Sequence, residues 1–215
     1  RILAADIAQA DALGYVIRLI GMASTSPASD EGPGQLFQRV HPHLVPFDHP
    51  LAHVDGASNA VVAEGNFSGQ LLFQGRGAGD GPTASAVVAD LIDIARSTIG
   101  GGEIGVPFSV PVAELEAMAP GAPDQRSGRA YVRLMVADRP GVLAEITAAM
   151  RDAGVSIESL IQKGRAGDSG EVMVAMVTHE GPESAVAEAV RLLDGSASLS
   201  EPPLVLHIQI GRAHV

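Results

Sequence analysis

The feature that most constrains this chain is a stretch from residue 100 to residue 128 in which glycine and proline recur too often for a helix or strand to continue. Such stretches usually connect parts that fold separately. The chain has 215 residues, of which 46% are hydrophobic, so two small domains with real cores are possible. We therefore expect a first domain over residues 1–100, a linker over 101–128 and a second domain over 129–210.

The second domain contains six predicted elements in an informative order. Alternating apolar residues predict strands, and apolar residues three and four positions apart predict helices. The order is β-α-β-β-α-β, the ferredoxin-like split pattern, so the predicted fold class is α+β. The elements are a strand over 130–136, a helix over 141–153, strands over 155–163 and 170–178, a helix over 182–193 and a strand over 203–209.

The first domain is predicted to hold two helices and four strands. Residues 35–45 alternate between apolar and polar, and Leu36, Val40 and Leu44 are expected to face a core. A glycine-rich turn, Gly75 to Thr83, precedes the last helix of this domain. The remaining elements are a helix over 6–13 ended by Gly14, a strand over 15–20, a loop over 24–34, a hairpin of strands 59–65 and 70–75, and a helix over 84–99.

Charge and composition exclude several classes of function. The net charge of -11 argues against nucleic acid or an anionic membrane surface as a partner, because both attract clustered Lys and Arg. The absence of cysteine excludes disulfides, thiolate zinc sites and a cysteine nucleophile, and fits a cytoplasmic protein. No apolar run approaches the roughly 18 to 20 residues of a membrane helix. The expected partners are small molecules and further copies of the chain, in a homo-oligomer.

The second domain carries a motif at its first strand-to-helix turn, Asp138-Arg139-Pro140-Gly141-Val142-Leu143. Pro140 suits a first helical turn, Gly141 permits close backbone approach, and the free N–H groups beyond it suit a carboxylate. An ordinary capped helix start is the alternative. With Val155-Ser156-Ile157 downstream, the motif resembles the ACT family signature.

The ACT resemblance implies an amino-acid sensor. Domains of this family typically bind a free amino acid, here one such as threonine, near the glycine turn and report it to an attached enzyme. Some bind nothing and only hold dimers together. Carried onto this sequence, the resemblance implies an effector site formed by Asp138, Gly141, Val142, Leu143 and Gln162, with Ser156 and Ile157 as weaker candidates.

The first domain carries two longer motifs, His49 to Val61 and Gly75 to Leu91. They resemble the distal catalytic-domain segments of homoserine dehydrogenases, and they occur in the family's order. The resemblance implies a partial catalytic domain, with a mixed sheet and helices. It also implies NAD(P)-dependent interconversion of L-aspartate-4-semialdehyde and L-homoserine in threonine and methionine biosynthesis. A non-enzymatic amino-acid-binding regulatory module of the ACT type is the alternative.

The glycine-rich turn is the predicted cofactor contact. Its glycines leave backbone N–H groups and a helix N-terminus open to a polar or anionic ligand. The resemblance implies that Gly77, Ala78 and Gly79 lie near the nicotinamide cofactor, NADP or NAD. The alternative is a tight turn whose glycines serve only backbone geometry.

Two parts that such an enzyme needs are not found in the sequence. The G-x-G-x-x-G at Gly100 to Gly105 follows a predicted helix and precedes Pro107, whereas the dinucleotide fingerprint needs a strand before it and a helix after it. The family is thought to transfer a proton through a lysine, but Lys163, the one lysine here, lies in the ACT-like domain. We expect the nucleotide-binding domain and the catalytic residues before Arg1, so the chain alone should be inactive, and its preference between NAD and NADP stays open.

Two further features are given no binding site. His41, His43, His49 and His53 crowd one region, but three of the four adjoin prolines and no carboxylate lies at the spacing of a known helix motif, so no metal site is predicted. His49 and His53 are expected to shape a loop beside the substrate cleft. Residues 211–215 resemble the translation of an adapter oligonucleotide and are expected to be a non-native tail.

Overall fold

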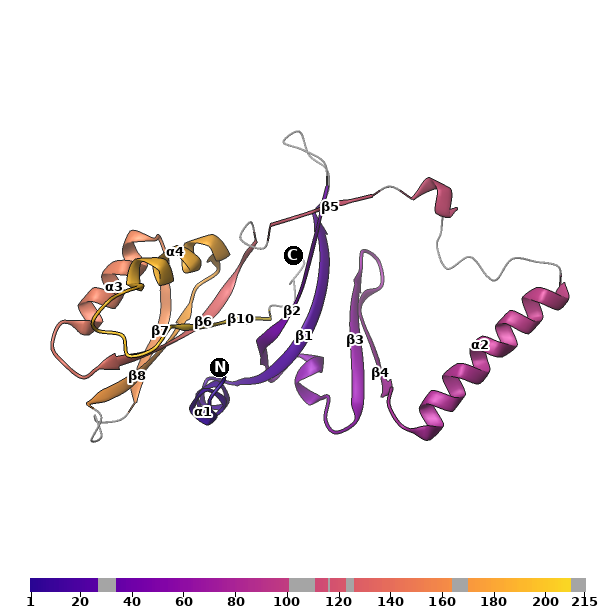
Figure 1. Cartoon of the computed structure of the whole chain (residues 1–215), viewed down its shortest axis with the longest axis horizontal. Coiled ribbons are helices and arrows are strands. Elements are labelled where there is room, and N and C mark those ends of the chain that lie inside the picture. Colours follow the sequence, from indigo (N-terminus) through magenta and orange to yellow (C-terminus); the bar gives the residue numbers. More distant parts are fainter. Residues whose placement is uncertain (27–33, 101–110, 116, 123–125, 164–169, 210–215) are drawn as a thin grey trace. The chain divides into compact units, whose positions relative to one another are not determined.

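The chain folds into two compact units, shown in Figure 1 as a computed structural model. The larger unit joins Arg1–Ala52 to Ala119–Val215, and the smaller unit is His53–Met118. The structure describes residues 1–26, 34–100, 111–115, 117–122, 126–163 and 170–209. The rejected glycine motif after Gly100, the interior of the predicted 24–34 loop and the predicted tail lie outside these ranges. Within them, no helix is both long and apolar enough to cross a membrane.

The larger unit is built on one mixed sheet. Its strands lie in the order β1, β2, β10, β6, β8, β7, and all neighbours on this path are antiparallel except β2 and β10, which are parallel. Two short strands add to it, β5 (Ala119–Pro120) beside β2 and β9 (Gly181–Pro182) beside β6. The main strands are β1 (Tyr15–Ser26), β2 (Gln35–Pro46), β6 (Ser127–Ala137), β7 (Ile157–Lys163), β8 (Glu171–Thr178) and β10 (Leu204–Ile208).

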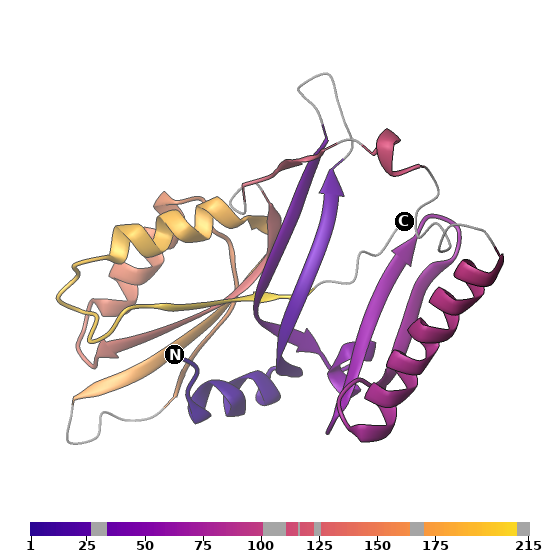
Figure 2. The same cartoon turned by 45° about the vertical axis from the view of Figure 1, so that its right-hand side comes forward.

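The predicted split pattern in the second half is confirmed. Strand β6 is followed by α3 (Val142–Asp152), β7, β8, α4 (Glu183–Leu193) and β10. Helices α3 and α4 lie together on one face of the sheet (Figure 2). Their apolar faces pack on alternate residues of the central strands, because successive strand side chains point to opposite faces. The core on this face includes Val132, Leu134, Val136, Ile146, Met150, Val174, Met176, Ala189 and Leu193.

The opposite face of the same sheet is covered by α1 (Ala4–Ala12). Ala10 of this helix packs with a second set of strand residues, including Leu44, Tyr131, Val177 and Leu206. Strands β6 and β8 therefore have buried side chains on both faces. This explains why residues 171–178 are almost continuously apolar rather than alternating.

The compact units differ from the predicted division at residues 101–128. Helix α1 and strands β1 and β2 join the sheet of the second half, where His43 pairs with His207 and Leu44 with Ile208. Hydrophobic patterns identify elements but do not say which distant strands pair, so this sheet was not predicted. The prediction that Val40 faces inward is wrong: its side chain is 73% exposed, because the core on that face covers only the Leu44 end of β2.

One predicted loop boundary is also corrected. The loop was expected to begin at residue 24, but β1 continues to Ser26 and pairs there with the start of β2, Ser24 with Phe37 and Thr25 with Leu36. Ser and Thr were interpreted as loop residues, but here their backbone groups complete an antiparallel ladder. The two strands therefore pair as an antiparallel hairpin, which the sequence analysis did not predict.

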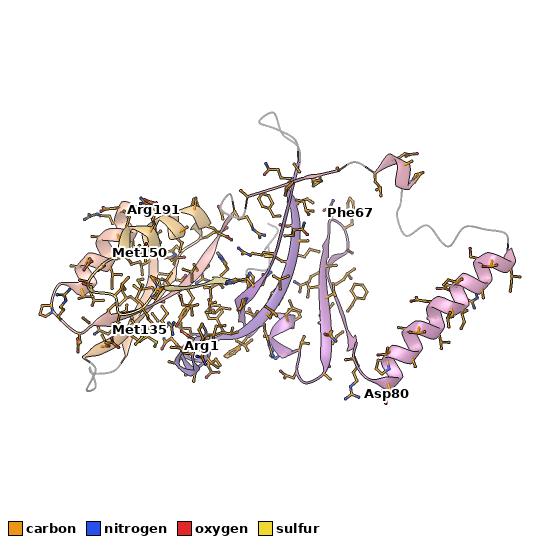
Figure 3. All side chains as sticks on the ribbon, viewed as in Figure 1. Arg1, Phe67, Asp80, Met135, Met150 and Arg191 are labelled. Atoms are coloured by element: carbon orange, nitrogen blue, oxygen red, sulfur yellow. The ribbon has the colours of Figure 1, made fainter. Side chains whose placement is uncertain are left out.

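The smaller unit holds the predicted hairpin and helix. Strands β3 (Ser58–Gly65) and β4 (Gly69–Arg76) pair antiparallel, and β4 leads into α2 (Asp80–Gly100). A short 3-10 turn, η2 (Val112–Glu114), follows. Helix α2 begins before the predicted residue 84, and the Thr83 N–H donates to the Gly79 carbonyl at 3.0 Å. None of the side chains described between residues 53 and 118 is buried, and Figure 3 shows Phe67 projecting from the tip of the hairpin.

Candidate functional site

A pocket of about 350 Å³ surrounds the turn between β6 and α3. All five predicted effector residues line it: Asp138, Gly141, Val142, Leu143 and Gln162. The first four come from the turn and the start of α3, whereas Gln162 comes from β7, at the edge of the sheet. The structure therefore brings together residues from two elements that the sequence separates. Further lining residues are Val136, Ala137, Arg139, Pro140, Val172 and Val174.

The backbone of the turn explains its sequence. Gly141 has a φ of 95°, a left-handed conformation that favours glycine, and α3 begins at the next residue. The Asp138 N–H donates to the Gly170 carbonyl at 2.9 Å, which fastens the turn to the start of β8. The first turn of a helix leaves amides without acceptors inside the helix, and the helix dipole favours an anion there. The pocket thus has a natural place for a carboxylate.

A network of side-chain hydrogen bonds supports the same turn. Arg139 Nη2 donates to Ser198 Oγ at 3.0 Å, and Ser198 Oγ donates to Glu145 Oε2 at 2.6 Å. The Ser196 hydroxyl donates to the other carboxylate oxygen of Glu145. These hydrogen bonds, with that of Ser196 first, lower the pKa of Glu145. The network ties the pocket turn to the segment that leads into β10.

The lining of the pocket combines one apolar wall with a few polar groups. Val136, Val172 and Val174 form the apolar side, and Asp138, Arg139 and Gln162 supply charge and hydrogen-bonding capacity. This mixture suits a small zwitterion, whose ammonium and carboxylate need opposite partners.

The lining of the pocket and the predicted effector residues differ at a few positions. Arg139 and the valines of β8 line the pocket but were not predicted as site residues. The signal available for them in the sequence was the end of a strand beside the glycine turn. Ile157, a weaker candidate, packs against the core beneath α3 and α4 and does not line the pocket, and neither does Ser156.

The predicted cofactor turn lies between β4 and α2 in the smaller unit. Gly77, Ala78 and Gly79 are all exposed, so main-chain groups are accessible there. Gly79 has a φ of 121°, which disfavours any other residue. At Gly77 a Cβ atom would lie 2.7 Å from Asn59 Nδ2 on β3, so any other residue there would require the Asn59 side chain to shift. Asn59 was not predicted as a site residue, and only the paired strands reveal its position.

Three histidines lie together in the structure, and they are not the four that crowd one region of the sequence. His41 and His43 on β2 lie beside His207 on β10, with ring centroids 5.8 to 6.0 Å apart. Glu183 accepts two hydrogen bonds from Arg39, at 2.7 and 3.1 Å, and lies 3.6 Å from His207 Nδ1. No group of three or more His, Asp or Glu side chains in the described ranges is arranged to hold a metal ion.

Burial dominates the chemistry of this histidine cluster. Desolvation lowers the pKa of His43 to about 4 and that of His207 to about 4, and the nearby positive charge of Arg39 acts in the same direction. Hydrogen bonding of His43 to the His41 carbonyl and the charge of Glu183 oppose the shift without overcoming it. Both rings are therefore neutral at pH 7.

Two family profiles match the chain, one described as homoserine dehydrogenase over residues 1–92 and one as ACT domain over residues 130–194. Residues 1–92 belong to the homoserine dehydrogenase family, and residues 130–194 form an ACT domain. The homoserine dehydrogenase of Pseudomonas aeruginosa is 35% identical over 210 residues, covering 97% of this chain and 47% of that protein. That of Mycobacterium tuberculosis is 39% identical over 193 residues, covering 88% and 42%. The chain thus spans about half the length of the relatives that it matches.

Solved structures agree with this assignment. The crystal structure of a homoserine dehydrogenase from Thiobacillus denitrificans superposes with a TM-score of 0.80 at 32% identity, covering 95% of this chain and 45% of that one. The Staphylococcus aureus homoserine dehydrogenase has the same fold, with a TM-score of 0.58 at 23% identity. The predicted family and the predicted ACT arrangement are confirmed. The homoserine dehydrogenase residues extend from α1 into α2, and therefore contribute to both compact units.

Proposed function

We propose that the complete protein interconverts L-aspartate-4-semialdehyde and L-homoserine with NAD or NADP, in threonine and methionine biosynthesis. The similarity to P. aeruginosa homoserine dehydrogenase over 97% of the chain carries this proposal. It also disfavours a non-enzymatic sensor, which would not need residues 1–92. We further propose a cytoplasmic homo-oligomer, in keeping with the absence of cysteine.

Within this enzyme, the turn at Gly77, Ala78 and Gly79 would hold the nicotinamide cofactor. The turn fits that role because its main chain is exposed and Gly79 opens a long helix, α2, whose N-terminal amides attract polar or anionic groups. The bound cofactor supplies or accepts the hydride. The chain's own contribution is to place main-chain donors beside the cofactor. We assign no proton donor to this chain, and Lys163 lies at the end of β7 in the ACT domain.

The test is oxidation of L-homoserine by the complete protein, followed through the absorbance of the reduced nicotinamide. The wild type should turn over with at least one of NAD and NADP. Gly79→Val should raise the KM for the cofactor by about tenfold or more, because a β-branched residue is strained at that φ. Gly81→Ala is the matched control, since a Cβ atom there meets nothing within 4 Å. No oxidation with either cofactor would end the enzymatic proposal.

For the ACT domain we propose that the pocket binds a free amino acid, threonine being the first candidate, and that its occupancy regulates the enzyme. The pocket supports this through its helix N-terminus, the carboxylate of Asp138 and the apolar wall. Calorimetry with a panel of amino acids should show binding that Asp138→Asn weakens by about tenfold, equivalent to one lost charge-assisted hydrogen bond. Asp152→Asn, on the exposed end of α3, is the control. Absence of heat with every amino acid would leave this domain a dimerising role.

A further inference from the structure

A buried polar cluster joins α1 to the central strand of the ACT domain. Asp6 and Tyr131 are fully buried and Arg133 is 3% exposed. Arg133 Nη1 lies 3.3 Å from Asp6 Oδ2, and the Tyr131 hydroxyl donates to Asp6 Oδ1 at 3.2 Å. The cluster thus links a residue of the homoserine dehydrogenase region to two residues of the ACT domain.

The cluster is built in a way that fixes one position of α1. The Leu3 N–H donates to Asp6 Oδ2 at 2.7 Å, and Arg133 Nη2 lies 3.2 Å from Glu201 Oε1. A buried ion pair is seldom the most stabilising choice, because apolar residues of the same size often serve stability as well. An ion pair specifies the position of the helix more strictly than apolar residues do, because a small displacement of the helix would leave a buried charge without its partner. Nε and Nη1 of Arg133 and Oε1 of Glu201 make no hydrogen bond among the described residues, so the cluster is incompletely satisfied even as it stands.

The same strand that carries Tyr131 and Arg133 also ends in the ACT pocket. Val136 and Ala137 of β6 line the pocket, and Asp138 follows directly. At a rise of about 3.3 Å per residue, the pocket wall lies roughly 10 Å along the strand from Arg133. Helix α1, for its part, passes through Gly14 into β1. One rigid element therefore touches both the pocket and the part of the chain that belongs to the enzyme.

We propose that the Asp6–Arg133 pair couples occupancy of the ACT pocket to the position of α1, and so to the homoserine dehydrogenase region. This inference rests on the proposed effector function of that pocket. A ligand that favours one placement of the end of β6 favours the placement of Arg133 that holds Asp6. By linkage, a docked α1 favours the ligand to the same degree. Arg133 is a positioning residue in this scheme and touches neither substrate nor effector.

The first test uses the complete enzyme with L-threonine as the probe. In the double variant Asp6→Asn/Arg133→Gln both charges are removed together, so neither is left buried alone. L-threonine should bind this variant with less than about tenfold change in Kd, while its maximal inhibition of homoserine oxidation falls to under about a third of the wild-type value. The matched control is Arg39→Gln/Glu183→Gln, which neutralises an ion pair between β2 and the first residue of α4 and should retain the inhibition. Full inhibition in the Asp6/Arg133 variant would overturn the proposal.

The second test needs no effector and uses the 215-residue chain. Val172→Ala opens a small cavity in the pocket wall, and Val186→Ala removes the same two carbons from α4 in the same core. Hydrogen exchange of the α1 amides should accelerate about fivefold or more with Val172→Ala, and by a smaller factor with Val186→Ala. In the Asp6→Asn/Arg133→Gln background, the two valine changes should accelerate this exchange equally. Equal acceleration by both valine changes in the wild-type background would overturn the coupling. If L-threonine fails to bind the wild type, the effector proposal loses that ligand and this exchange test alone decides the coupling.

Discussion

The two compact units carry one predicted site each, but they differ in how those sites are supported. In the larger unit, side chains are buried on both faces of the sheet, and the pocket turn is fastened to β8 and braced by Arg139, Ser198 and Glu145. In the smaller unit, no described side chain is buried. Phe73 on β4 is 61% exposed and Leu91 on α2 is 59% exposed.

This contrast shows where each site can be studied. A lone two-stranded hairpin is marginally stable in water, and a helix apolar around most of its surface is usually a buried one. The glycine turn therefore needs the complete protein for its function to be measured. The ACT pocket has its own core within this chain, so its ligand and its energetics can be measured directly.

The largest expected difference between the units comes from shortening a core leucine. Leu134→Ala, fully buried on β6, should lower the free energy of unfolding by about 3 kcal/mol, because it leaves a cavity in a packed core. Leu91→Ala on α2 is the matched change and should alter it by less than about 0.5 kcal/mol. Urea unfolding of the chain followed by circular dichroism measures both. Equal losses would show that α2 has a core that the described structure lacks.

A smaller difference should follow from replacing the left-handed glycine that precedes α3 and the one that precedes α2. Gly141→Val should lower the free energy of unfolding by about 2 kcal/mol, since valine is strained at a φ of 95°. Gly79→Val imposes similar strain at the start of α2, where little cooperative structure is lost, so the main thermal transition should stay within about 2 °C of wild type. Gly181→Ala, which has open space for a Cβ atom, is the control for the larger unit. A transition temperature lowered by more than about 2 °C with Gly79→Val would contradict the difference expected between the two units.

The histidine cluster predicts a pH dependence for the larger unit alone. Burial holds the pKa of His43 and of His207 at about 4, below the ordinary value of 6.5. Between these values the unfolded chain binds protons that the folded chain does not, so stability is greatest above pH 6.5 and falls as the pH drops toward 4.

From pH 7 to pH 5.5 the loss should be about 2 kcal/mol, allowing for the partial exposure of His207. Urea midpoints at the two pH values measure it. His43→Gln should flatten the slope, whatever it does to stability at pH 7. An unchanged slope in that variant would show that the imidazole of His43 is protonated in the folded state at pH 5.5.

The elements and pocket residues that sequence predicted depend on neighbours in the chain. The period of apolar residues identified β6, α3, β7, β8, α4 and β10 in the correct order, although not the short β9. Asp138 to Leu143 are adjacent, so their meeting at one turn follows from the motif itself. Gln162 joins them because β7 lies beside β8, an arrangement that the ferredoxin-like order implies.

The features that sequence did not predict depend on contacts between distant residues. Nothing in the pattern of β2 indicates a parallel partner at His207, and nothing in the apolar run around Arg133 indicates that its charge is buried against Asp6. A charged residue within a strand is normally placed on the solvent side. Only the docking of α1 onto that face reverses the expectation.

The smallest expected effect comes from removing a single hydroxyl group at the start of α3, for which the start of α2 has no counterpart in this comparison. Ser196 and Ser198 both donate to Glu145 in the first turn of α3, and these bonds hold the pKa of that carboxyl below its usual value of 4.5. Ser196→Ala should raise the pKa toward 4.5, and Ser198→Ala should raise it less, because the Ser196 bond is the larger cause. Carbon-detected NMR titration of the Glu145 carboxyl measures the shift.

The consequence for stability follows from the sign of that shift. A carboxyl with a lowered pKa in the folded state stabilises the fold above its ordinary pKa, and that contribution disappears as the pH falls through the folded value. Glu145 is exposed, so the loss in Ser196→Ala should be slight at pH 7 and should shrink as the pH falls. Helix α2 begins instead with a local bond from Thr83 to Gly79. If removing Ser196 left the titration of Glu145 unchanged, the bracing of the ACT turn would rest on Arg139 and Ser198 alone.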